Sequence, residues 1–164
     1  SLRSVPGCGN EVIANSDEHN TAGYSNEESK NRLEQMEKRM QKLQTCVKED
    51  MPAPRLIGPK NADLTVVSWG SNKGAILEAM KNFSNVNFLH VTWVSPFPTK
   101  EVKNILCKAK RILNIECNYT AQMGGLIKER TGIEIENNLL KYDGRPFYPE
   151  EITAKIKKVL TAKK

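Results

Sequence analysis

Residues 64–74 read LTVVSWGSNKG, a run of strand-forming residues that passes directly into a glycine-rich turn. Val, Thr and Trp favour extended backbone, and the Gly-Ser-Asn-Lys-Gly segment at 70–74 ends the run and opens an amphipathic stretch. A buried strand, a tight turn and a helix in this order form the repeating unit of α/β folds. The stretch therefore predicts a sheet with crossover helices.

The same unit recurs toward the C-terminus. We expect strands at 64–69, 86–94, 111–116 and 134–142, and helices at 72–83, 99–109, 119–131 and 149–163. Strands that are joined through helices run parallel, and right-handed crossovers place the helices on both faces of the sheet. The sequence therefore predicts a three-layer α/β/α domain with a mostly parallel sheet over residues 61–164.

The N-terminal part has a different pattern. Residues 1–25 show no sustained periodicity and are expected to be irregular, whereas 27–48 carry one narrow apolar stripe along a predicted helix. The stripe consists of Leu33, Met36, Met40, Leu43 and Val47. Because such a stripe needs a partner surface, we expect it to form an interface with the α/β domain, another copy or another domain. The prolines between 52 and 59 predict a stiff linker, which makes residues 1–60 an N-terminal helical arm.

Composition excludes several classes of protein. Of 25 basic and 19 acidic residues, 7 and 9 lie in 1–50, which leaves 18 and 10 after residue 50. The basic residues after residue 50 lack interleaved aromatic residues, so we expect a solvated basic face and no nucleic-acid partner. The apolar runs are far shorter than the about 20 residues that span a bilayer, and no apolar leader opens the chain, so no membrane association is expected.

The cysteines of the chain do not have the spacing of metal ligands. They are Cys8, Cys46, Cys107 and Cys117, and no C-x-x-C pair occurs among them. This spacing predicts neither a zinc site nor an iron–sulfur cluster within the chain. Together with the missing leader, it predicts four reduced thiols and a cytoplasmic location.

Polar residues follow the first and third predicted strands and are candidates for a ligand crevice. They are Ser71, Asn72, Asn118, Tyr119 and Gln122. Open parallel sheets bind ligands at the carboxyl ends of their strands, so these side chains could line a phosphate- or nucleotide-binding crevice. The turn at 70–74 has neither dinucleotide-binding nor P-loop spacing. Asn118 can equally cap a helix, and Glu116 can simply anchor the turn, so both readings stay open.

No set of residues in the sequence predicts a catalytic site. The chain has no Ser-His-Asp order, H-E-x-x-H motif or nucleophile elbow, so we assign no catalytic and no metal-binding residues. Asp17-Glu18-His19 gathers acids around a histidine, but it lies on the irregular arm, where a preorganised site would lack rigid support. His90 alternates within an apolar strand and is expected to be a hydrogen-bonded core or edge residue.

Six segments in one order resemble the C-terminal part of the alpha subunit of 2-oxoacid:ferredoxin oxidoreductases, a transketolase C-terminal-like domain. The segments are Ser16-Asp17-Glu18-His19, Met36-Glu37-Lys38-Arg39-Met40, Gly70-Ser71-Asn72-Lys73-Gly74, Ser95-Pro96-Phe97-Pro98, Glu116-Cys117-Asn118-Tyr119-Thr120 and Lys141-Tyr142-Asp143-Gly144-Arg145-Pro146-Phe147. Two positions, Cys117 and Tyr148, depart from the residues that the family usually has there. The resemblance extends over almost the whole chain.

The resemblance implies an enzyme that oxidatively decarboxylates a 2-oxoacid and forms an acyl-CoA. Such enzymes use thiamine diphosphate, magnesium and iron–sulfur clusters, and their partners here would be the remaining alpha domains, the beta subunit, ferredoxin and CoA. The Gly-Asp-Gly diphosphate motif is absent, since only Asp143-Gly144 occurs. The resemblance therefore implies a fragment without bound cofactor that serves domain packing and subunit assembly. The alternative is an independent phosphate- or nucleotide-binding module.

Overall fold

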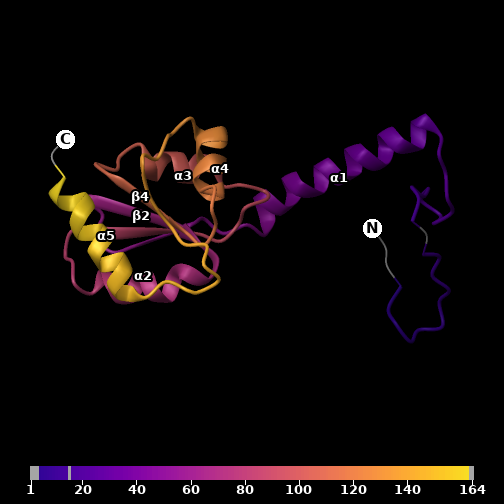
Figure 1. Ribbon diagram of the computed structural model, residues 1–164. Coiled ribbons are helices and arrows are strands. Elements are labelled where there is room, and N and C mark those ends of the chain that lie inside the picture. The colour runs from indigo at the N-terminus through magenta and orange to yellow at the C-terminus, as the bar shows by residue number, and fades with distance from the viewer. Residues whose placement is uncertain (1–3, 15, 163–164) are drawn as a thin grey trace. The chain divides into compact units, whose positions relative to one another are not determined.

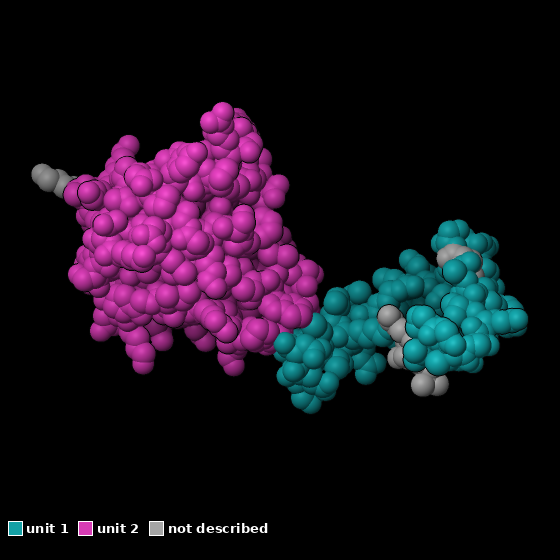
Figure 2. Space-filling view, turned by 90° about the horizontal axis from the view of Figure 1, so that it is seen from below, with its two compact units in different colours: residues 1–50 teal, residues 51–164 magenta. Residues whose placement is uncertain are grey.

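The computed structural model describes residues 4–14 and 16–162 of the chain. The chain divides into two compact units, residues 1–50 and residues 51–164, which Figure 2 shows in different colours. Unit 1 holds one long helix and the segment before it, and unit 2 holds the sheet with its covering helices. The division falls before the proline-rich segment that was predicted to be a linker.

Unit 2 is built on a five-stranded sheet with the order β1-β3-β2-β4-β5. The strands are β1 (Arg55–Ile57), β2 (Leu64–Trp69), β3 (Val86–Val91), β4 (Ile112–Glu116) and β5 (Asn137–Leu140). The pairs β2–β3, β2–β4 and β4–β5 are parallel, whereas β1 is antiparallel to β3. The mostly parallel sheet confirms the predicted fold class.

Helices cover both faces of this sheet. They are α2 (Lys73–Met80) and α5 (Pro149–Thr161) on one face, and α3 (Thr99–Leu106) and α4 (Gln122–Thr131) on the other (Figure 1). Phe88, Ile76 and Ile152 belong to the apolar cluster under α2 and α5, while Leu89 and Ile127 belong to the cluster under α3 and α4. Alternate residues of β3 thus serve opposite cores, as the two-residue period of a strand requires.

The proline-rich segment contributes strand β1, which the sequence analysis missed. Arg55–Ile57 pairs with Phe88, Leu89 and His90 of β3, and Asn87 Nδ2 donates a 3.0 Å hydrogen bond to the carbonyl oxygen of Pro59. A strand of three residues is too short to show alternation in a sequence. The segment predicted as a linker therefore extends the edge of the sheet.

The described residues before helix α1 (Ser29–Glu49) form no helix or strand, as predicted for residues 1–25, but residues 18–26 contact the helix through side chains. Asn31 Nδ2 donates to the carbonyl oxygens of His19 at 3.3 Å and Asn26 at 3.2 Å, and Glu18 accepts hydrogen bonds from Arg32 (2.7 Å) and Arg39. These side-chain contacts hold the segment before α1 against the helix. Within the acidic segment 17–19, Glu18 is thus held by ion pairs with Arg32 and Arg39.

The ion pairs of Glu18 predict how acid affects this contact. The hydrogen bond from Arg39 is the main cause that lowers the pKa of Glu18 from 4.5 to about 2. A lowered carboxyl pKa contributes stability that is present above the unfolded value and is lost as the pH falls through the folded value. We therefore expect the segment around Glu18 to stay bound to α1 at pH 4 and to detach as the pH approaches 2.

Carboxyl-carbon NMR titration measures this directly in the full chain. Glu18 should titrate near pH 2, and Arg39→Gln should move its midpoint toward 4.5. Asp17→Asn is the matched control, because Asp17 is exposed and should leave the Glu18 midpoint in place. A Glu18 midpoint near 4.5 in the unmodified chain would contradict the ion-pair assignment.

Candidate functional site

Glu116 is a fully buried carboxylate at the end of β4. Its side chain accepts five hydrogen bonds: Oε1 from Asn114 Nδ2 (2.6 Å) and Gly124 N (3.1 Å), and Oε2 from Trp69 Nε1 (3.1 Å), Asn118 Nδ2 (2.7 Å) and Met123 N (2.9 Å). We call these five donors and the carboxylate the Glu116 network. The donors come from β2, β4, the loop after β4 and the first turn of α4.

The hydrogen bonds of the network keep Glu116 ionised. Burial by itself raises the pKa of this carboxyl group, but hydrogen bonds from Asn114, Met123, Asn118 and Gly124 outweigh it and hold the pKa below its usual value. The two backbone N–H groups also lie at the positive end of the α4 dipole. A buried negative charge is therefore stabilised by fixed donors, with no cation required.

The network lies at the switch point of the sheet. The chain adds β3 on one side of β2 and then adds β4 on the other side of β2. Sheets of this kind bind ligands in the crevice at such a reversal, which the carboxyl ends of β2 and β4 border here. Trp69 ends β2 and Glu116 ends β4. In this chain the first turn of α4 directs its N–H groups at a side chain of the same chain.

The loop before α4 has an unusual backbone that fits this role. Ala121 has φ 53° and ψ 52°, and it is the one non-glycine residue with positive φ in the described part of the chain. The helix was predicted to begin at 119 with Asn118 as its cap, but it begins at Gln122. The predicted start was wrong because Asn118 and Ala121 instead turn the chain, so that the first turn of α4 meets the Glu116 carboxylate. Asn118 Oδ1 still accepts a 3.3 Å hydrogen bond from Gln122 N.

The structure divides the five predicted crevice residues among different environments. Asn72 is buried, where it donates to Ser68 Oγ (3.2 Å) and the Ile115 carbonyl oxygen (3.4 Å) and accepts from the Cys117 thiol (3.1 Å). Asn118 is part of the Glu116 network and contacts Gln122. Both asparagines therefore join β2, β4 and their loops, and their amide groups are used inside the protein.

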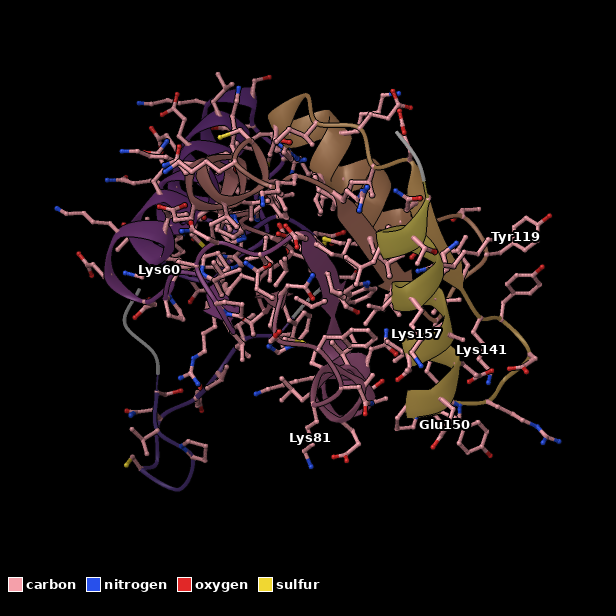
Figure 3. All side chains as sticks on the ribbon, turned by 90° about the vertical axis from the view of Figure 1, so that its left-hand side faces the viewer. Lys60, Lys81, Tyr119, Lys141, Glu150 and Lys157 are labelled. Atoms are coloured by element: carbon pink, nitrogen blue, oxygen red, sulfur yellow. The ribbon has the colours of Figure 1, made fainter. Side chains whose placement is uncertain are left out.

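The other crevice residues lie at the surface. Tyr119 is 69% exposed and contacts Tyr142 edge-to-face, with 4.8 Å between ring centroids. Figure 3 shows Tyr119 and Lys141 on the same side of the molecule. Ser71 lines an open cavity of about 490 Å³ whose other walls are Cys117, Lys141, Tyr142, Gly144, Arg145 and Pro146. The structure thus places Ser71 and Tyr142 near one cavity and the asparagines outside it.

Lys141, the most enclosed cation of this cavity, already has a partner. Its ammonium group lies 2.8 Å from both carboxylate oxygens of Glu151, and this contact raises the pKa of Lys141. Glu151 also accepts a 2.7 Å hydrogen bond from Tyr148 N, which caps α5. The capping of α5 is therefore preserved although Tyr148 lacks the short side chain that usually caps a helix. Glu151 thus offsets the charge of Lys141, and Arg145 is the other cation that lines the cavity.

The remaining candidates from the sequence are the four cysteines and His90, which was expected to be hydrogen-bonded but whose buried Nε2 atom has no partner among the described residues. His90 is buried in β3, and burial is the main cause that lowers its pKa. Within residues 4–14 and 16–162, no group of three His, Cys, Asp or Glu side chains could hold a metal ion, and all four cysteines are unpaired. No helix in this described part is long and apolar enough to cross a membrane.

Two adjacent glycines of α4 give a matched test of the network. A Cβ at Gly124 would lie 3.1 Å from Asn114 Nδ2, whereas a Cβ at Gly125 would meet nothing within 4 Å. Asn114 cannot easily withdraw, since its amide also donates to Glu116 and Asn138. Alanine raises helix propensity by about 1 kcal/mol at either position. We therefore expect Gly125→Ala to raise the thermal midpoint and Gly124→Ala to lower it, and similar midpoints for the two variants would contradict the close packing of α4.

Comparisons with known proteins agree with this fold. The family model described as pyruvate:ferredoxin oxidoreductase core domain II matches residues 62–159. The alpha subunit of 2-oxoacid:ferredoxin oxidoreductase from Saccharolobus solfataricus is 36% identical over 150 residues, which cover 88% of this chain and 24% of that protein. The chain thus spans about a quarter of the length of this curated relative.

Solved structures show the same similarity. A 2-oxoglutarate:ferredoxin oxidoreductase from Magnetococcus marinus matches with a TM-score of 0.82 and 26% identity, covering 98% of this chain and 29% of that chain. A split-gene transketolase matches with a TM-score of 0.54 and 16% identity over 70% of this chain and 44% of that chain, which shows a shared fold alone. The family match and the curated relative confirm the resemblance seen in the sequence, and the chain belongs to the 2-oxoacid:ferredoxin oxidoreductase alpha-subunit family.

Proposed function

We propose that this chain is the C-terminal part of the alpha subunit of a thiamine-diphosphate-dependent 2-oxoacid:ferredoxin oxidoreductase and serves domain packing and subunit assembly. The enzyme would oxidatively decarboxylate a 2-oxoacid to an acyl-CoA in the cytoplasm. Its other partners would be the remaining alpha domains, the beta subunit, ferredoxin and CoA. Family membership supports the enzyme class, and the chain spans 24% of the relative's length, which leaves room for catalysis in other domains.

The apolar stripe on α1 is the observation that carries the assembly role. Its five side chains stay exposed: Leu33 by 64%, Met36 by 37%, Met40 by 49%, Leu43 by 43% and Val47 by 43%. Contiguous apolar side chains of this kind mark interaction surfaces in soluble proteins. The polar face with Asn31 and Gln35 is the one that α1 buries within the chain. We therefore assign the stripe to an interface with the rest of the enzyme.

Two features of the described residues argue against cofactor binding within this chain. Thiamine diphosphate and magnesium would need free donors and carboxylates, but the N–H groups at the start of α4 already bind Glu116. An iron–sulfur cluster needs clustered thiolates, and the described residues hold no such cluster. We therefore assign these cofactors to other parts of the enzyme. The occupied start of α4 also favours the packing role over an independent phosphate- or nucleotide-binding module.

Removing residues 1–50 should weaken association but leave the α/β domain folded. Unit 2 holds both apolar clusters of the sheet, so residues 51–164 should keep a cooperative thermal transition. Light scattering should show weaker association of this shorter chain, with itself or with the partner subunit. A molten or insoluble product would show that α1 belongs to the core of the domain.

Two double variants of the full chain test whether the stripe, and not the other faces of α1, is responsible for association. Met40→Lys with Leu43→Lys should weaken association, because both side chains lie on the stripe. Gln41→Lys with Thr45→Lys adds the same charge on another face of the helix and should leave association unchanged. Equal effects of the two pairs would contradict the interface assignment.

The chain alone should reduce neither ferredoxin nor a viologen dye with any 2-oxoacid and CoA. The cofactor performs the electron transfer in such enzymes, and the residues that would position it lie outside this chain in our proposal. A spectrophotometric assay of the pure chain with added thiamine diphosphate, magnesium and CoA tests this. Oxoacid-dependent dye reduction would contradict the noncatalytic role.

A further inference from the structure

We propose that the five donors of the Glu116 network form a carboxylate-binding site that the chain fills with its own side chain. When the Glu116 carboxylate is removed, this site binds a small free carboxylate such as formate. The proposal does not depend on which enzyme the chain serves, because it concerns only contacts within unit 2. It extends the network from a structural contact to a site with a defined ligand class.

The donors have supports of their own, apart from Glu116. Asn114 Nδ2 also donates to Asn138 Oδ1 at 2.9 Å, and Asn118 Oδ1 accepts from Gln122 N at 3.3 Å. The Met123 side chain packs in the cluster under α3 and α4. Sheet, loop and helix thus hold the donors in position when the carboxylate is removed.

An empty site would be unfavourable for the chain. Each buried donor without an acceptor lowers stability, and charged acceptors form the stronger hydrogen bonds. The site combines side-chain amides, an indole N–H and two backbone N–H groups at the start of a ten-residue helix. A free carboxylate supplies two charged oxygens in the geometry that these donors already fit, whereas chloride supplies a single centre. The site therefore selects carboxylates over chloride.

The size of the removed side chain defines the preferred ligand. Glu116→Ala removes the Cγ atom and the carboxyl group. Formate replaces the carboxyl group and leaves the space of Cγ as clearance from the alanine Cβ. Acetate has as many heavy atoms as the substitution removes. Because it is not bonded to the alanine Cβ, its methyl group must keep van der Waals distance from that atom, and acetate is therefore more crowded in the site than formate. We expect formate to bind better than acetate, and propionate not to bind, because the Glu116 side chain that the ligand replaces is fully buried.

In the unmodified chain the site is closed to outside anions. A tethered carboxylate has a high effective concentration, so a free anion cannot displace it at ordinary concentrations. Phosphate and free carboxylates should therefore leave the signals of Met123 and Gly124 unchanged. Covalent tethering thus keeps the five donors occupied.

Thermal unfolding of full-length Glu116→Ala tests the proposal. At matched ionic strength, about 0.5 M sodium formate should raise the midpoint by about 5 °C over sodium chloride, in a saturating manner. The unmodified chain should show no such difference. The backbone amide NMR signals of Met123 and Gly124 should move with formate in the variant, and those of Gly132 at the far end of α4 should not.

Glu151→Ala is the matched control. Glu151 also accepts a backbone N–H at the start of a helix, but its side chain is 42% exposed, so water can replace it. Formate should not stabilise this variant beyond chloride. If both variants respond equally, or if the Met123 and Gly124 signals of Glu116→Ala stay in place, the proposal is wrong.

Refolding covers the case in which Glu116→Ala does not fold in chloride. The unfolded variant is then diluted into formate or chloride at the same concentration and followed by near-ultraviolet circular dichroism. Recovery of the native signal in formate alone supports the site. Failure to recover in formate as well as chloride overturns it. Neither outcome bears on the assembly role of α1, so the two proposals fail separately.

Discussion

The buried carboxylate of Glu116 is the interaction on which the arrangement of unit 2 depends. It gathers an indole N–H from β2, amides from β4 and its loop, and two backbone N–H groups from α4. A charge without a cation is tolerated there because five donors replace its hydration shell. The left-handed backbone of Ala121 and the close approach of Gly124 to Asn114 are both consequences of bringing α4 to this carboxylate.

Filling the switch point from within changes what the fold can do. In open parallel sheets the carboxyl ends of the central strands are the usual ligand site. Here that place contains a packed internal network beside the open cavity of Ser71 and Lys141, and the five side chains of the apolar stripe are exposed on α1 in the other unit. The chain belongs to the 2-oxoacid:ferredoxin oxidoreductase alpha-subunit family, and this distribution agrees with our proposal that it contributes surfaces for assembly. The chemistry of the parent enzyme then belongs to domains outside this chain in our proposal.

Side-chain contacts between distant segments explain where the sequence analysis fell short. Strand β1 has three residues among prolines, and it is defined by pairing with β3 more than 30 positions later. The segment before α1 has no periodicity, yet Glu18 binds it to the helix through ion pairs with Arg32 and Arg39. Asn118 resembles a helix cap in the sequence, whereas in the structure it donates to Glu116. Local pattern has no access to the pairing of β1 or to the arginine partners of Glu18, and it does not decide between the two roles of Asn118, although Glu116 lies only two positions away.

The sequence by itself determined the α/β class, the order of the main strands and helices, and the apolar stripe of α1, because hydrophobic periodicity is a local property of the chain. The predicted helix 119–131 also ends where α4 ends, at Thr131, and Gly132 follows it in the left-handed conformation that favours glycine. Only the tertiary structure decided that Glu116 is buried and fully paired. That outcome depends on Trp69 and Gly124, which lie 47 and 8 positions away in the chain, and their distance from Glu116 is set by packing of the sheet against α4.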